Sequence, residues 1–326
     1  MIEPTIQDLI KPIEKELEQF QREFENALHS DIELINTISH YIVSQEGKKI
    51  RPSLLLLSAR LCGQPNNDSY IAASLVEILH TATLVHDDIV DESEERRGQP
   101  SVKALWKNKV SVLLGDYLFS KSLRSMLRLK NFEALEMLSE TSELLSSGEL
   151  LQLGKSYTNG MDEDIYYRMI WAKTASLFAT ACKLGGMTVG ADSGKTEKLW
   201  LYGKYLGIAF QIKDDLLDFT GSKKDIGKPI GRDIKANLIT LPLLYTMQKL
   251  PPREGQRLRK LIRSDLNEEE IARVNSLIAV QGGLDYTRQV LDRFSKQALE
   301  QLDMFPDSEI KECLCGFVLF NQKRLN

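Results

Sequence analysis

Residues 68–91 read DSYIAASLVEILHTATLVHDDIVD and are strongly apolar until the final turns. The apolar residues recur at helical spacing, so the stretch predicts one long α-helix. A helix that is apolar on more than one face belongs at the centre of a bundle, because each face needs apolar neighbours. Residues 195–220 carry the same pattern. The two stretches together favour a large all-α fold.

Helical periodicity extends along nearly the whole chain, and the alternation typical of strands is almost absent. Breaks such as Asn159-Gly160 and Pro251-Pro252 separate the helical segments. No linker-like or low-complexity stretch divides the chain, so we expect a single domain over residues 1–326. The predicted helices cover residues 5–28, 31–45, 51–62, 68–91, 109–130, 132–157, 163–188, 195–220, 237–250, 254–263, 268–280, 283–303 and 307–323.

The composition has no acidic or basic extreme. A net charge of −4 over 326 residues gives no electrostatic case for nucleic acid as a main partner. The four cysteines form no CxxC pair, which favours reduced thiols over a zinc site. The N-terminus lacks a signal-peptide core, and no run approaches the roughly 18 apolar residues of a membrane span. We therefore expect a cytoplasmic protein without an integral membrane segment.

Both of the long apolar helices end in the pattern Asp-Asp-x-x-Asp, at residues 87–91 and 214–218. In a helix the first and last aspartates of each pattern share a face, and the middle one lies about 100° around the axis. Stacked carboxylates repel one another, and burial raises that cost unless a cation compensates. One copy could be a solvated acidic helix end, but two copies after apolar turns favour a metal site. Hard oxygen ligands suit Mg²⁺, which commonly shares its coordination shell with substrate phosphates.

Several cations are candidates for contacts with such a polyphosphate. Arginine forms bidentate contacts with phosphate oxygens, and lysine acts as a point charge. Residues 221–233 form a Gly-rich basic segment, which would suit either a phosphate-covering loop or a plain surface loop. Each cation alone is more often a surface charge, although Lys173 and His80 interrupt apolar stretches. The candidates are Lys48, Lys49, Arg51, Arg96, Arg97, Lys173 and Lys228.

Taken together, these residues resemble the trans-type polyprenyl diphosphate synthase family. The resemblance spans roughly residues 40–325, and it implies an all-α bundle of the isoprenoid synthase type with a central substrate cavity. The motifs that carry it are GKKIRP (47–52), EILHTATLVHDDIVDESEERRGQPS (77–101), GDYLFSKS (115–122), GELLQL (148–153), AKTASLF (172–178), LGIAFQIKDDLLD (206–218), and GKPIGRD (227–233) followed by TLPLL (240–244).

The resemblance implies a set of roles, numbered here in this chain. It implies two or three Mg²⁺ ions and two substrates, isopentenyl diphosphate and an allylic diphosphate. The metal ligands would be Asp87, Asp91, Asp214 and Asp218, and the catalytic group would be Asp87, Asp88, Asp91, Lys173, Thr174, Gln211, Asp214 and Asp215. Isopentenyl diphosphate would contact Lys48, Arg51, His80 and Arg97, and the allylic diphosphate would contact Arg96, Lys173, Thr174, Gln211 and Lys228.

The chain departs from the family pattern at one position. Many members place a lysine shortly before the TLP motif, where this chain has Leu238. Lys235 is the nearest cation that could take over the contact. The departure bears on the affinity for phosphate and leaves the reaction class unchanged.

Product length is suggested by the helix before the first aspartate pattern. Short-chain members of the family block the path of the growing chain with an aromatic residue four or five positions before Asp87, where this chain has the small residues Thr83 and Ala82. Because the size of an apolar pocket limits what fits in it, we expect a long product, about C30–C50. The floor of the path would lie lower, at Leu79 or at Phe119, Leu123 or Met126 on the next helix, although these four could equally be plain core packing.

Other interpretations agree less well with the motifs. A class I terpene cyclase usually carries a different second metal motif and lacks a segment such as GKKIRP. A non-catalytic regulatory subunit tends to lose one aspartate pattern, and both are intact here. A short-chain synthase remains the main alternative for the product. The apolar segments 109–130 and 132–157 would suit a homodimer interface, and they would equally suit an internal core.

Overall fold

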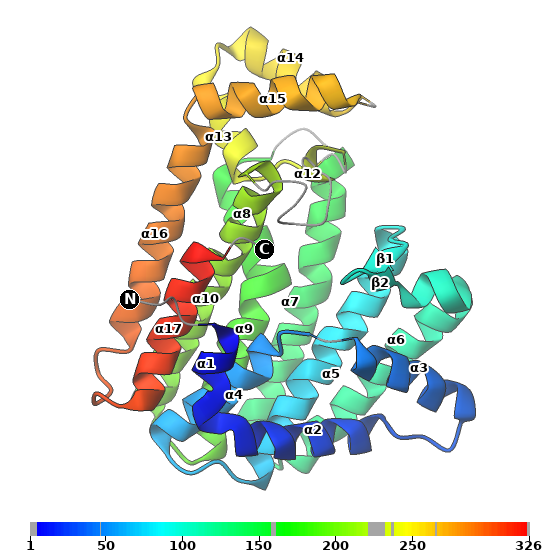
Figure 1. Ribbon diagram of the computed structural model, residues 1–326, viewed down its shortest axis with the longest axis vertical. Coiled ribbons are helices and arrows are strands. Elements are labelled where there is room, and N and C mark those ends of the chain that lie inside the picture. Colours follow the sequence, from blue (N-terminus) through cyan, green and yellow to red (C-terminus); the bar gives the residue numbers. More distant parts are fainter. Residues whose placement is uncertain are drawn as a thin grey trace. The chain divides into compact units, whose positions relative to one another are not determined.

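The computed structural model describes residues 5–45, 47–157, 161–220, 232–235, 238–264 and 266–324. The all-α prediction is confirmed, because within these residues the only strands are β1 (Glu95–Arg96) and β2 (Gln99–Pro100) (Figure 1). None of the described helices is long and apolar enough to cross a membrane. The helices are α1 (Ile6–Ile10), η1 (Lys11–Ile13), α2 (Glu14–Leu28), α3 (Glu33–Ser44), α4 (Ile50–Cys62), α5 (Asn67–Val90), α6 (Val102–Arg128), α7 (Phe132–Tyr157), α8 (Glu163–Ile170), η2 (Trp171–Ala175), α9 (Ser176–Thr188), α10 (Ser193–Thr220), α12 (Arg232–Lys235), α13 (Leu241–Lys249), α14 (Pro252–Ile262), α15 (Glu268–Val280), α16 (Gly283–Gln301) and α17 (Glu309–Lys323).

The chain divides into two compact units, each assembled from several segments. The expectation of a single domain stays a prediction. Unit 1 comprises Met1–Glu143, Leu177–Gly203 and Leu302–Gly316, and unit 2 comprises Leu144–Ser176, Lys204–Gln301 and Phe317–Asn326.

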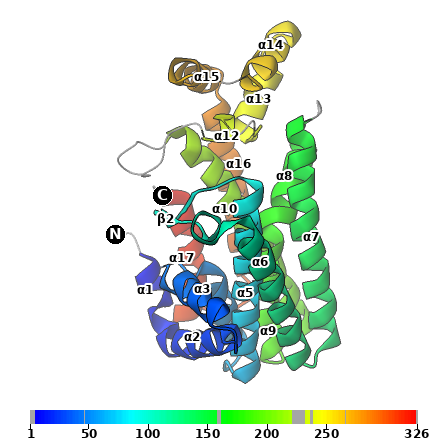
Figure 2. The same ribbon diagram turned by 90° about the vertical axis from the view of Figure 1, so that its right-hand side faces the viewer.

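In unit 1 the helix that the sequence identifies as central is indeed buried. Leu75, Val76 and Ile78 of α5 are fully buried, as are the four consecutive leucines 54–57 of α4. Figures 1 and 2 show α5 running beside α6. The helix begins where the sequence offers a cap, because the Asn66 side chain accepts hydrogen bonds from the backbone N–H groups of Asp68 and Ser69. Its C-terminal end carries the first aspartate pattern.

Unit 2 contains two apolar clusters. One joins α8, η2, α10, α13 and α16, with Tyr166, Ala209 and Ile212 fully buried in it. The other joins α13, α14 and α15 around Leu258, Ile262 and Ile278. The first cluster supports the C-terminal half of α10, which carries the second aspartate pattern.

Three local features differ from the predicted helices. α6 begins at Val102, where the Ser101 hydroxyl accepts from the Ala104 N–H at 3.1 Å, and it is kinked at Lys107, whose φ is 68°. The part after the kink agrees with the segment predicted at 109–130, and the short part before it was not predicted. The segment predicted at 163–188 is interrupted by the π-helical turn η2. A hairpin of two-residue strands was not predicted, and it turns through Arg97 and Gly98, both with positive φ.

Candidate active site

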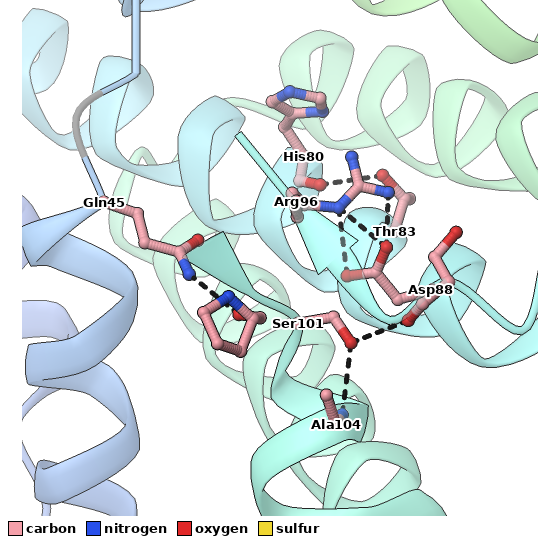
Figure 3. A network of polar contacts seen from close by, with 9 residues as sticks. Gln45, His80, Thr83, Asp88, Arg96, Ser101 and Ala104 are labelled. Atoms are coloured by element: carbon pink, nitrogen blue, oxygen red, sulfur yellow. Dashed lines mark hydrogen bonds and ion pairs between the residues drawn. The ribbon is translucent and has the colours of Figure 1, made fainter. Parts of the chain in front are cut away.

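The first aspartate pattern lies at the C-terminal end of α5, and its three carboxylates have different surroundings. Asp88 is buried, Asp87 is half-buried, and Asp91 is exposed at the cap position. Arg96 of the hairpin forms an ion pair with Asp88. Its Nε lies 2.8 and 2.9 Å from the two carboxylate oxygens, and its Nη2 lies 2.6 Å from Oδ1 (Figure 3). A buried carboxylate needs such a partner, so Asp88 fixes the position of Arg96.

The hairpin that carries Arg96 and Arg97 is itself tied to neighbouring helices of unit 1. The Ser101 hydroxyl donates to the Ser93 carbonyl at 2.7 Å, and this closes the base of the loop. The Pro100 carbonyl accepts from the Tyr41 hydroxyl at 2.6 Å and from Gln45 Nε2 at 3.4 Å. The Gln45 and Ser101 contacts are visible in Figure 3. These bonds tie the hairpin that carries the two arginines to the C-terminal end of α3.

The residues predicted to bind isopentenyl diphosphate also lie in unit 1. Arg51 Nη1 and His80 Nε2 are 2.9 Å apart, and the Arg51 guanidinium lies 4.8 Å from the centre of the Phe178 ring. Arg97 donates to the Gln45 carbonyl at 3.3 Å. Lys48 is exposed in the loop before α4. The structure therefore joins Arg51 to His80 directly and places Arg97 on the neighbouring hairpin.

A pocket of unit 1 lies beside these groups. Its walls come from α2, α3, α5 and the hairpin, and its charged lining consists of Lys49, Glu77, Asp88, Arg96 and Arg97. Lys49, a candidate cation with no assigned role, lines this pocket. Glu77 was not among the candidate residues. Burial raises the pKa of Glu77, and the nearby Arg51 and Arg97 oppose that shift.

His80 is electrically neutral at ordinary pH. Burial lowers its pKa well below the usual value, and the neighbouring guanidinium groups of Arg51, Arg97 and Arg96 lower it further. Because Arg51 can only donate, His80 Nε2 is the acceptor in their hydrogen bond. The imidazole therefore serves as a hydrogen-bond partner for Arg51 and carries no charge of its own.

The second aspartate pattern lies near the end of α10 in unit 2, and its middle carboxylate is again buried. Asp215 accepts from the Tyr166 hydroxyl at 2.6 Å and from Gln211 Nε2 at 2.9 Å. Thr174 Oγ1 in turn donates to Gln211 Oε1 at 2.8 Å. The pKa of Asp215 is raised to about 7, mainly by burial. The two hydrogen bonds oppose this rise, and the nearby carboxylates of Asp214 and Asp218 add to it. A continuous hydrogen-bonded chain therefore links Asp215 to Thr174.

The two outer aspartates of this pattern have partners within unit 2. Asp214 pairs with Arg324 at 2.6 Å. Arg324 also donates to the Phe210 carbonyl at 2.8 Å and stacks on the Phe210 ring at 4.0 Å, so its guanidinium is firmly placed. Asp218 accepts from the backbone N–H of Asp233 at 3.1 Å. Both carboxylates thus lie close to hydrogen-bond donors from other elements.

Lys173 lies on the π-helical turn and is held by a carboxylate. Glu149 Oε2 is 2.5 Å from its ammonium nitrogen, and Gln152 Oε1 is 3.3 Å away. Gly148 allows this contact, because a Cβ at that position would lie 2.8 Å from the Lys173 backbone nitrogen. The GELLQL motif therefore places α7 directly against the turn that carries Lys173 and Thr174.

Three residues that contact the predicted site residues were not themselves predicted: Glu149, Tyr166 and Arg324. Glu149 could have been found, because it belongs to the GELLQL motif. Nothing in the sequence singles out Tyr166 or Arg324. Lys228 lies outside the described residues.

The positions proposed to set product length differ in exposure. Leu79 and Ala82 are buried, and Phe119 is 37% exposed. Thr83 is half-buried, and its hydroxyl donates to the His80 carbonyl.

The donor set suits magnesium that is shared with a bound ligand. Among the described residues, no group of three or more His, Cys, Asp or Glu is gathered closely enough to hold a metal with protein atoms alone. Mg²⁺ usually keeps several waters and takes only one or two carboxylates together with substrate phosphates. Carboxylates at two helix ends, with Arg96 and Lys173 nearby in their own units, fit that chemistry.

These features define a diphosphate-using, all-α prenyltransferase. The chain belongs to the polyprenyl synthetase family, whose model matches residues 32–279. It is 38% identical to the octaprenyl diphosphate synthase of Escherichia coli, over 89% of this chain and 90% of that protein. It is 33% identical to a short chain isoprenyl diphosphate synthase of Methanothermobacter thermautotrophicus, over 90% and 92% of the two chains. A crystal structure of polyprenyl synthase from Caulobacter crescentus, complexed with calcium and isoprenyl diphosphate, aligns over all of both chains with 34% identity and a TM-score of 0.92.

The state of His80 gives a prediction about stability and pH. Unfolded chains bind a proton at histidine below about pH 6.5, whereas the half-buried His80 stays neutral, so the native state binds fewer protons and loses stability as the pH falls. We expect His80→Asn to reduce this loss by about 1.4 kcal/mol for each pH unit below 6.5. The measurement is the free energy of unfolding in urea between pH 5.5 and 7.5.

The matched control is His29→Asn, which replaces an exposed histidine of the same unit. It should keep the pH dependence of the wild-type protein. Identical slopes for the wild type and His80→Asn would contradict the neutral, acceptor state of His80.

Proposed function

We propose that this prenyltransferase makes a long-chain all-trans polyprenyl diphosphate, about C30–C50, because its product path lacks a blocking side chain near the first aspartate pattern. The observation that carries the length is Ala82, a small buried residue of α5 that lies five positions before Asp87. The substrates are isopentenyl diphosphate and an allylic diphosphate. Their use follows from membership of the family and from the two aspartate patterns with cations beside them.

The chain's own residues would hold two diphosphates. Arg96, Lys173, Thr174, Gln211 and Lys228 bind the allylic diphosphate, and Lys48, Arg51, His80 and Arg97 bind isopentenyl diphosphate. Asp87, Asp91, Asp214 and Asp218 would hold two or three Mg²⁺ ions, which when bound neutralise negative charge on the diphosphate. Asp88 and Asp215 position their neighbours, since both are buried and already paired.

The reaction then depends on where the residues place positive charge. The allylic C–O bond breaks and its electron pair leaves with the diphosphate, whose growing charge Arg96 and Lys173 stabilise. The double bond of isopentenyl diphosphate attacks the allylic cation, and loss of a proton restores a double bond. Thr174 and Gln211 present oxygens towards the cation. The released diphosphate accepts the proton, which agrees with a neutral His80 whose Nε2 is already bonded to Arg51.

The direct test is incubation with Mg²⁺, radiolabelled isopentenyl diphosphate and farnesyl diphosphate, with the products dephosphorylated and sized by chromatography. We expect one main product of about C30 or longer, because Thr83 and Ala82 are too small to block the proposed path. Asp87→Asn is the matched control and should lower turnover by about a hundredfold or more, since it removes a proposed metal ligand.

Products that stop at about C15–C20 would keep the reaction class and overturn the proposed length. No incorporation by the wild-type protein would instead favour a regulatory subunit that acts with a partner synthase.

Ala82→Tyr tests the path directly. A tyrosine at this buried position would fill the space beside α5 and stop elongation at about C15–C20, with turnover retained. The measurement is the product distribution under the same conditions. Ala82→Ser keeps the side chain small and should leave the product unchanged. Long products from Ala82→Tyr would show that the chain grows elsewhere.

The family resemblance and an exposed apolar stripe support a homodimer. Val112, Leu113, Phe119, Leu123 and Leu127 of α6 are 37–68% exposed and recur along one side of the helix. Exposed leucines are ordinary when scattered, but five large apolar residues on one side of a helix indicate an interaction surface, although the exposed Asp116 and Ser120 lie among them. The same stripe contains Phe119, so the proposed product-length position would lie at the dimer contact.

Leu113→Glu combined with Leu127→Glu should weaken the dimer by about a hundredfold or more, because a buried unpaired charge costs several kcal/mol. Sedimentation of the purified protein measures this change. Val280→Glu, on an exposed residue of α15, serves as the control and should stay dimeric. A fully active wild-type monomer would contradict the proposed interface.

A further inference from the structure

Helix α14 carries a dense cluster of positive charge in a chain that is mildly acidic overall. Residues 252–263 contain five cations, Arg253, Arg257, Arg259, Lys260 and Arg263, and one acid, Glu254, for a net charge of +4. The whole chain has a net charge of −4. The concentration therefore lies in one short helix of unit 2, beside α13 and α15 (Figure 1).

The cations occupy one side of the helix. At about 100° per residue they fall within an arc of about 160°, whereas Leu258 and Ile262 point the opposite way. Those two residues are buried in the cluster with α13 and α15, at 5% and 1% exposure. Arg253, Arg257 and Lys260 are exposed. Because the inner side is fixed to unit 2, the outer side is a preformed basic face, defined here as Arg253, Arg257, Arg259 and Lys260.

This basic face is not balanced by neighbouring carboxylates. Within the described ranges, none of its four residues forms an ion pair, whereas cations on neighbouring helices do: Arg273 pairs with Glu269, and Arg288 pairs with Asp285. Like charges three or four positions apart weaken a helix, and the basic face contains 253/257 and 257/260 pairs of this kind. A multivalent anionic surface would relieve that repulsion.

We propose that the basic face of α14 binds the surface of an anionic phospholipid membrane. The choice of a lipid partner rests on the proposed function, since a polyprenyl diphosphate of that length is itself a lipid and must pass to a lipid phase. Clusters of Lys and Arg on a helix bind anionic headgroups, each cation contributing roughly fivefold in affinity. Leu261, 37% exposed at the edge of the same helix, offers an apolar contact at the interface. Charge and shape thus fit a peripheral contact with no inserted segment.

The test is sedimentation of the full-length protein, without substrates, with vesicles of phosphatidylglycerol and phosphatidylcholine or of phosphatidylcholine alone. We expect binding to the anionic vesicles only. The triple variant Arg253→Gln, Arg257→Gln and Lys260→Gln should lose about a hundredfold of the partition coefficient. Raising the salt to about 0.5 M should weaken binding of the wild type, because the screening length falls to a few ångströms.

A matched control removes the same net charge elsewhere. Lys15→Gln, Lys130→Gln and Lys296→Gln are exposed positions outside α14, and this variant should bind vesicles as the wild type does. Equal vesicle binding by the two triple variants would overturn the proposal, as would absence of binding by the wild type. Tighter binding to single-stranded DNA than to the anionic vesicles would overturn the lipid assignment in favour of a nucleic acid. Because no substrate is present, these results stand apart from the synthase assay.

Discussion

Two buried aspartates, Asp88 in unit 1 and Asp215 in unit 2, impose the constraint on which the candidate residues of each unit depend. A carboxylate inside an apolar helical core needs donors with good geometry, or its burial costs several kcal/mol. Asp88 receives a guanidinium, that of Arg96. Asp215 receives two neutral donors, Tyr166 and Gln211. The difference matters, because the ion pair fixes a cation in place, whereas the neutral donors orient the side chains of Gln211 and Thr174.

The middle and outer residues of each aspartate pattern therefore differ in their role. The middle residue organises the protein, and the outer residues remain on the helix face where a ligand could approach. Lys173 is likewise held by a partner of opposite charge. Glu149 keeps its ammonium group in place, while 27% of the Lys173 side chain stays exposed. Long flexible cations lose rotamer entropy when they bind phosphate. Fixing them beforehand with carboxylates of the same unit reduces that cost.

The sequence predicted which helices carry the candidate site residues better than it predicted the contacts that these residues make. Long apolar periodicity identified α5 and α10, and the repeated aspartates marked their ends. The partners were harder, since Tyr166 lies 49 residues from Asp215 and appears in the sequence as one more aromatic on an apolar face. The hairpin was missed because two-residue strands leave no alternation to detect, although Gly98 marked its turn. The π-helical turn has no signal of its own, because helical periodicity continues on both sides of it.

That turn makes the number of residues, and not only their identity, a condition for function. Tyr166 precedes the π-helical turn and Lys173 and Thr174 lie within it, so the turn sets the angle between the Asp215 contact and the Glu149 contact. A single inserted or deleted residue between them would rotate one contact against the other by about 100°. The length of this stretch is therefore as strict a requirement for these contacts as the side chains of Tyr166, Lys173 and Thr174.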